Sequence, residues 1–185
     1  MAIEPLQSPR IARFLSDPRR IAGLCDTFGS PLNVVFPEQV AENLAAFQKA
    51  LSERMIDGRV LCTSKPNRSR AVLSMLARRG LSVDVSSRRG LAEALSSGIP
   101  GSRIQITGPK TVDYLAVAAA HGSTITIDNP SELEMLSAVV RGFQPLTPTS
   151  ILLRIRGRRS GFRAGQDTTP TFGSSEAEIA GVLTK

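Results

Sequence analysis

The chain has 185 residues, and 41% of them are hydrophobic, which is enough for one domain with a hydrophobic core. Its two cysteines and single histidine are too few for a disulfide framework or for a zinc or iron centre, so we expect no metal site. The net charge of +7 would suit a basic RNA-binding fragment, but with aromatic residues at only 4% few rings can stack on bases, so we favour an anionic small molecule over nucleic acid as the partner.

The N-terminal part is predicted to be mainly helical. Met1–Pro5 lacks the apolar stretch of a signal peptide, and no run in the sequence is long and apolar enough to span a membrane, so we expect a cytoplasmic protein. Pro9–Phe28 is predicted as a helix broken at Pro18, and Ser30–Phe36 as a short strand. Pro37–Arg54 has apolar residues at helical spacing and is predicted as an amphipathic helix.

The remainder of the chain alternates strand-like and helix-like segments. The predicted strands are Val60–Thr63, Ser82–Val85, Arg103–Thr107, Thr124–Ile127 and Ser150–Ile155. The predicted helices are Ser69–Arg79, Arg89–Ser97, Val112–Ala120 and Pro130–Val140, and Gly80, Gly98 and Gly122 follow three of them as C-terminal caps. A short helix is expected at Ser174–Leu183.

This alternation predicts β/α units and a parallel sheet. No Gly-x-Gly-x-x-Gly follows a strand, which disfavours a dinucleotide-binding fold. The even spacing of the strands favours a (β/α)₈ barrel of the TIM type. Because a complete barrel needs about 250 residues, we expect an incomplete barrel that lacks some of its strands.

Lys65 is the first candidate site residue. It ends the first predicted barrel strand, where the sites of β/α barrels are built. Pro66 suits the first turn of a helix, and Asn67 can accept hydrogen bonds from backbone groups in the same bend. We expect the amine to be partly buried in the mouth of the barrel, the alternative being a solvated loop lysine. Lys49 and Lys110 are expected to be surface lysines.

Three further residues are candidates for the same mouth. Asp84 ends the second strand, where it can pair with Arg154 or, alternatively, cap the helix that begins near Arg88. Arg154 lies between apolar residues in a strand, a setting in which an arginine needs an anionic partner. Ser86 can line a ligand pocket or belong to an ordinary loop.

Seven short motifs occur in a characteristic order: Gly29–Phe36, Thr63–Asn67, Val83–Ser87, Ile106–Lys110, Ile127–Leu133, Leu152–Ile155 and Phe172–Gly173. In this order they resemble the N-terminal portion of the fold-type III pyridoxal-phosphate (PLP) decarboxylases, the group of diaminopimelate, ornithine and arginine decarboxylases. The resemblance implies an alanine racemase-like barrel. It also implies a PLP-dependent amino-acid decarboxylase, a lyase that acts as a homodimer in amino-acid metabolism.

In this family the lysine of the second motif forms a Schiff base with PLP, and the resemblance gives that role to Lys65. It likewise implies that Asp84, Ser86 and Arg154 help to bind the cofactor, with the phenolic oxygen of PLP as an alternative partner for Arg154. A neutral amine is needed for attack on an aldehyde, and partial burial of Lys65 would favour it. A non-catalytic PLP-binding homeostasis protein is the alternative function.

The resemblance also predicts the domain organisation. Residues 1–36 would supply an N-terminal helix and an opening strand to a β-domain, and residues 37–185 a partial PLP-binding barrel. The opening strand argues against the non-catalytic alternative, whose members lack a β-domain. The match stops before the family's phosphate-binding and substrate-choosing motifs, so we expect a truncated or split member whose substrate the sequence does not identify.

Overall fold

The computed structural model describes residues 8–156 and 172–183. The chain divides into two compact units, Met1–Asp57 and Gly58–Lys185. Among the helices of the described residues, none combines the length and the apolar character that crossing a bilayer requires.

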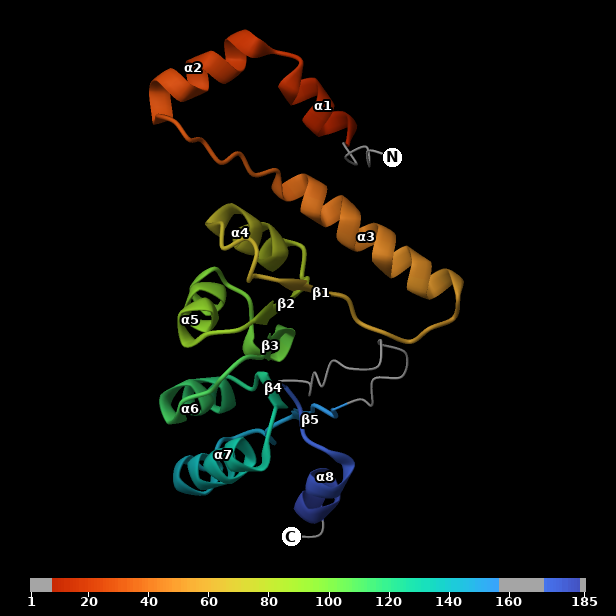
Figure 1. Ribbon diagram of the computed structural model, residues 1–185, viewed down its shortest axis with the longest axis vertical. Helices are drawn as coiled ribbons and strands as arrows, with labels where there is room; N and C mark the ends of the chain where they lie inside the picture. Colours follow the sequence, from red (N-terminus) through yellow and green to blue (C-terminus); the bar gives the residue numbers. More distant parts are fainter. Residues whose placement is uncertain (1–7, 157–171, 184–185) are drawn as a thin grey trace, which may run out of the picture. The chain divides into compact units, whose positions relative to one another are not determined.

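The first unit contains α1 (Pro9–Leu15), α2 (Pro18–Phe28) and α3 (Pro37–Glu53) (Figure 1). Each of these helices starts with a proline, whose fixed φ suits the first turn, and Ser8 and Asp17 cap α1 and α2 through their side chains. The predicted break at Pro18 and the predicted helix from Pro37 are therefore confirmed. The rings of Phe14 and Phe36 meet edge to face at 5.4 Å and tie α1 to the start of α3.

The strand predicted at Ser30–Phe36 is wrong. This segment is irregular, and no ladder hydrogen bond joins it to any strand that the structure describes. Pro31 has no backbone N–H, and an extended segment becomes a strand only when another strand lies beside it. The assignment of residues 1–36 to a β-domain stays a prediction.

The second unit is built on a parallel sheet that contains five strands in the described residues (Figure 1). The strands are β1 (Leu61–Thr63), β2 (Ser82–Val85), β3 (Ile104–Ile106), β4 (Thr124–Ile127) and β5 (Ile151–Leu153), and their order in the sheet is their order in the chain. Figure 1 shows the intervening helices on one side of the strands. Consecutive parallel strands with helices on one face form the wall of a β/α barrel.

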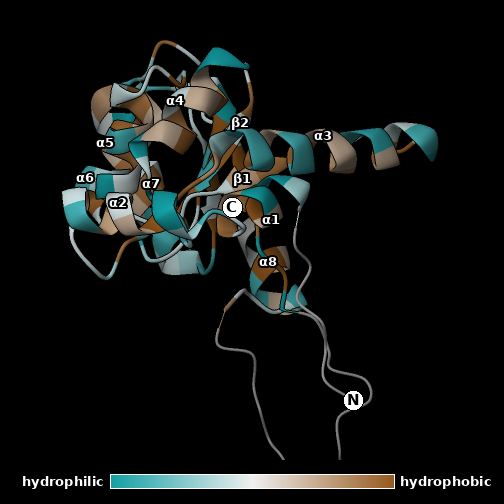
Figure 2. Ribbon diagram, turned by 90° about the horizontal axis from the view of Figure 1, so that it is seen from above, coloured by the Kyte–Doolittle hydropathy of each residue, from teal (hydrophilic) through white to brown (hydrophobic). Residues whose placement is uncertain are grey.

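The helices between the strands are α4 (Arg70–Arg78), α5 (Arg88–Ser96), α6 (Val112–Ala120) and α7 (Pro130–Phe143), with a 3₁₀ turn η1 (Gly101–Arg103) before β3 and α8 (Glu176–Leu183) near the C-terminus. All the predicted barrel strands and helices are found, with ends displaced by a few residues. Figure 2 shows hydrophobic and hydrophilic residues mixed along α4 and α5, as expected for helices that cover a sheet with one face.

The two faces of the sheet differ in polarity. Val83, Val85 and Ile106 are completely buried and belong to the core that the helices cover. The alternating positions point to the other face, where Asp84 is paired in register with Thr63 on one side and with Gln105 on the other. The barrel-facing side is therefore polar near the carboxyl ends of the strands, where a site is expected.

Replacing Gly101 with alanine is expected to lower the free energy of unfolding by about 1–3 kcal/mol, the usual cost of overpacking. A Cβ at Gly101 would lie 1.7 Å from the carbonyl oxygen of His121, so η1 or the end of α6 would have to move. Gly142→Ala is the matched control, because a Cβ on Gly142 meets nothing within 4 Å. Urea denaturation of both variants measures the difference, and equal midpoints would contradict the close approach.

Candidate cofactor site

The carboxyl ends of the five described strands meet at one edge of the sheet, and the candidate residues lie at this edge. Lys65 follows β1, Asp84 and Ser86 lie at the end of β2, and Arg154 follows β5. The pairing continues past the strand ends, since the N–H of Ser64 donates to the carbonyl of Asp84 at 2.9 Å. The backbone at this edge is therefore held by hydrogen bonds between neighbouring strands.

Lys65 occupies an ordered bend between β1 and α4. Asn67 Oδ1 accepts a hydrogen bond from the N–H of Ser69 at 2.9 Å, as its predicted capping role requires, and Ser69 in turn caps α4. The Lys65 side chain is exposed, so the prediction of partial burial is wrong for the described residues. The reason is that β1 is an outermost strand of the described sheet and has a neighbouring strand, β2, on one side only.

Asp84 faces the barrel side and does not cap a helix. Ser87 takes that place, because its Oγ accepts from the N–H of Gly90 at 3.1 Å. Oδ2 of Asp84 accepts from Thr63 Oγ1 at 3.2 Å, whereas the buried Oδ1 has no hydrogen-bond partner in the described part of the chain. A buried carboxylate oxygen without a partner is costly, so this position suits a donor brought by a ligand.

Tyr114 of α6 contacts the end of β2 next to Asp84, and sequence reasoning did not identify it. The ring is buried and its hydroxyl donates to the carbonyl of Val85 at 3.2 Å. Burial, and secondly the charge of Asp84, raise the pKa of Tyr114 well above its usual value. Tyr114 therefore supports the end of β2 as a neutral phenol. It is the only tyrosine in the sequence, but nothing in its local pattern indicated this contact.

Tyr114 is expected to ionise only as the protein unfolds. The folded state favours the neutral phenol, so the stability that this side chain contributes is complete below pH 10 and is lost as the pH rises through the higher folded-state pKa. The chain contains no tryptophan, so the near-ultraviolet absorbance of tyrosinate reports Tyr114 alone. A titration midpoint near pH 10 in protein that is still folded by circular dichroism would contradict this expectation.

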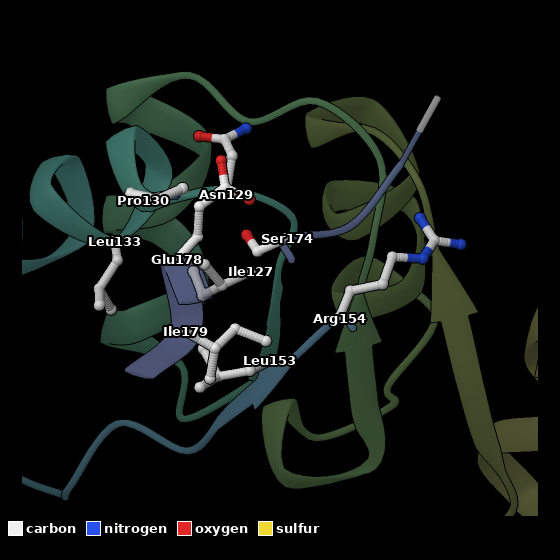
Figure 3. Close-up of a pocket in the computed structure, with 9 residues that line it drawn as sticks. All are labelled: Ile127, Asn129, Pro130, Leu133, Leu153, Arg154, Ser174, Glu178 and Ile179. Carbon is white, nitrogen blue, oxygen red and sulfur yellow. The ribbon is translucent and has the colours of Figure 1, made fainter. Parts of the chain in front are cut away.

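Arg154 pairs with Asp128 and not with Asp84, so the predicted pairing with Asp84 is wrong, whereas the alternative partner, the phenolic oxygen of PLP, stays a prediction. Its Nη1 lies 3.1 Å from Oδ1 of Asp128, and its guanidinium carbon lies 5.2 Å from the ring centroid of Phe172. The sheet order explains the difference, because β5 lies beside β4 and Asp84 is three strands away on β2. Figure 3 shows the guanidinium extending away from the other labelled side chains.

Lys110 is buried, which corrects its prediction as a surface lysine. Its Nζ lies 2.9 Å from Oε2 of Glu132 and 2.7 Å from the carbonyl oxygen of Gly108. The exposed fractions of the Lys110 and Glu132 side chains are 0% and 9%. The sequence placed both residues in recognisable motifs but gave no sign that they meet, because they lie on different β/α units.

The small pocket in Figure 3 lies between β4, β5, α7 and α8. Its apolar lining comes from Ile127, Leu133, Leu153 and Ile179. The enclosed space is about 10 Å³, about enough for one water molecule. The pocket is too small for a cofactor. The candidate site is instead the edge of the sheet at which the carboxyl ends of the strands meet. The residues that the structure describes contain no group of three His, Cys, Asp or Glu side chains that could hold a metal ion.

Comparison with known proteins identifies the family. Residues 38–176 match the family model described as "Pyridoxal-dependent decarboxylase, pyridoxal binding domain". The chain belongs to this family. The predicted family, its PLP cofactor and the α/β barrel fold are thereby confirmed, whereas the roles of individual site residues are not tested by this match.

The relatives are longer than this chain. The chain is 36% identical over 132 residues to the uncharacterized protein y4yA of Sinorhizobium fredii, covering 70% of this chain and 28% of the relative. It is 33% identical over 134 residues to a diaminopimelate decarboxylase of Actinosynnema pretiosum, covering 71% and 29%. Among solved structures, the diaminopimelate decarboxylase of M. jannaschii has a TM-score of 0.73 at 21% identity, over 88% of this chain and 40% of that one. The chain thus spans less than a third of the length of these two curated relatives.

The residues at the strand edge fit the ring of PLP. Lys65 offers an exposed amine, Arg154 an exposed cation, and Asp84 a buried oxygen that lacks a donor. Gly108 allows the backbone after β3 to lie close to the backbone after β2, since a Cβ at Gly108 would lie 2.8 Å from the carbonyl oxygen of Ser86.

Proposed function

We propose that this chain forms the cofactor-binding part of a PLP-dependent amino-acid decarboxylase and that Lys65 binds PLP covalently. One observation carries the residue assignment. The sequence has four lysines, and among the three in described residues Lys65 alone lies at the carboxyl edge of the sheet with its side chain exposed. Lys49 lies on α3 and pairs with Glu53, and Lys110 is buried against Glu132.

The other residues of the edge would orient the cofactor and its substrate. When bound, PLP supplies an electron sink for the electron pair that remains as carbon dioxide leaves. Arg154 would hold an anionic oxygen, because its guanidinium is partly exposed even while it pairs with Asp128. Asp84 would accept a hydrogen bond through its free Oδ1, and Ser86 would border the ring from the end of β2.

The wider properties belong to the same proposal. Relatives and structural neighbours carry the names diaminopimelate, arginine and lysine decarboxylase, which supports an amino-acid substrate. The homodimer and the cytoplasmic location expected from the sequence stay predictions. So does the assignment of residues 1–36 to a β-domain and of residues 37–185 to a partial barrel.

Covalent trapping tests the proposal. The chain is incubated with PLP, reduced with borohydride, digested and mapped, and the phosphopyridoxyl group is expected on Lys65. The four lysines fall at widely separated positions, so one peptide map distinguishes Lys65 from Lys49, Lys110 and Lys185. A map with Lys49 or Lys185 labelled in preference to Lys65 would overturn the assignment.

A second measurement separates a decarboxylase from a PLP-binding protein without turnover. Carbon dioxide release is followed with a panel of amino acids that includes diaminopimelate, lysine, arginine and ornithine. Release that depends on both PLP and Lys65 supports the decarboxylase. Stable labelling of Lys65 without release from any member of the panel would favour the non-catalytic alternative.

A further inference from the structure

The buried pair of Lys110 and Glu132 joins two β/α units. Lys110 lies in the loop between β3 and α6, and Glu132 lies in the first turn of α7, after β4. Removing two charges from water costs several kcal/mol per ion, and a pair of apolar residues often stabilises a fold as well or better. The stability of the fold alone therefore does not require an ion pair at this position.

The pair holds the end of β4. Oε2 of Glu132 accepts from Lys110 Nζ at 2.9 Å and also from the backbone N–H of Asp128 at 3.0 Å. The carbonyl oxygen of Asp128 accepts from Ser174 Oγ at 3.1 Å. The backbone of Asp128 is therefore fixed through both its donor and its acceptor, and its carboxylate is left to act on another group.

That group is Arg154. The Asp128 side chain is 11% exposed and its Oδ1 receives Nη1 of Arg154, while the ring of Phe172 lies against the guanidinium. The backbone of Arg154 is also fixed, because its N–H donates to Ile127 and its carbonyl accepts from Ser174. A chain of contacts thus runs from Lys110 through Glu132 and Asp128 to Arg154, across β3, β4 and β5.

We propose that Lys110 and Glu132 are positioning residues that set the place of Asp128 and, through it, the orientation of the Arg154 guanidinium at the cofactor-facing edge. The part of this inference that concerns the cofactor rests on the proposed function. The part that concerns Arg154 does not, because it describes the protein without a ligand. Neither Lys110 nor Glu132 touches the cofactor in this arrangement.

The first test uses the chain without PLP. The ¹⁵N NMR signal of the Arg154 Nε–H group is assigned by its loss in Arg154→Lys, and it is then compared in Glu132→Gln and in Lys110→Met/Glu132→Leu. The double variant removes both charges together and is expected to fold even where Lys110→Met does not. The Arg154 signal is expected to move in both variants. In the control Glu93→Gln, which removes an exposed ion pair with Arg89 on α5, it is expected to stay in place.

The second test is a double-mutant cycle read by the rate of PLP labelling at Lys65. Lys110→Met/Glu132→Leu is expected to slow labelling about tenfold in the natural background, and by less than about twofold when Arg154→Met is already present. A role in general stability would slow labelling by the same factor in both backgrounds. Equal factors, or an Arg154 signal that is unchanged in both folded variants, would overturn the proposal.

The two tests also separate this inference from the proposed function. If the Arg154 signal moves as expected while Lys65 is not labelled by PLP in any variant, the positioning of Arg154 stands and the function assigned to Lys65 fails. If Lys65 is labelled normally and the Arg154 signal does not respond, the function stands and the positioning role fails.

Discussion

Replacing Lys65 with alanine is expected to abolish the phosphopyridoxyl adduct and to lower any PLP-dependent turnover by about 10²–10⁴-fold, the range typical of losing a positioned proton-transfer group. The adduct is expected to disappear because no other lysine in the described residues has an exposed amine at the carboxyl edge of the sheet. Lys65→Arg is expected to behave like Lys65→Ala, since it keeps the positive charge but lacks an amine that attacks an aldehyde.

Lys49→Ala is the matched control for this experiment. Lys49 is an exposed lysine on α3 whose partner is Glu53 in the next helical turn, so its loss removes one surface amine of the first unit. Labelling at Lys65 is expected to be unchanged in this variant. If Lys65→Ala is labelled as strongly as the natural chain, Lys65 is not the cofactor lysine.

Replacing Lys110 with methionine is expected to lower the free energy of unfolding by about 3–5 kcal/mol, because it leaves the buried Glu132 carboxylate without its counter-ion. This is a large share of the about 5–15 kcal/mol that stabilises a typical domain. Lys110→Met/Glu132→Leu is expected to regain most of the loss, since both charges are then removed from the interior. Urea midpoints and slopes of the two variants measure the effect.

The exposed pair of Arg89 and Glu93 provides the comparison. Both residues lie on α5, and the Arg89 side chain is 80% exposed, so Arg89→Met is expected to change the free energy of unfolding by at most about 1 kcal/mol. A double variant at Lys110 and Glu132 that is as unstable as Lys110→Met would show that the loss comes from packing and not from the unpaired carboxylate.

The barrel wall was predictable because its signals are local. Apolar residues at helical spacing, runs of β-branched residues and glycines after helices each depend on a few neighbouring positions, and together they gave every strand from β1 to β5. The positive φ of 64° at Gly80 and 67° at Gly122 shows the left-handed conformation that the predicted C-terminal caps need. The order of motifs then identified the family.

The contacts of the site were harder to predict because they depend on which strands are neighbours. Asp84 was one of two partners expected for Arg154, yet adjacency in the sheet gives it Asp128. Lys110 was expected at the surface, since no local pattern shows that Glu132 of the following unit meets it. The expected strand at Ser30–Phe36 failed for a related reason, as its composition suits a strand but pairing requires a second segment.

The strand order also bears on how the second unit acquires its fold. Each strand after β1 pairs with the strand that directly precedes it in the chain, so the sheet can extend one β/α unit at a time as the polypeptide is synthesised. At each stage the newest strand is the template for the next. In the described sheet that place belongs to β5, where Ile151 and Leu152 are 41% and 47% exposed. An unpaired strand edge is a template for pairing, so at each stage of synthesis this growing edge is the part of the sheet to which the next segment can add.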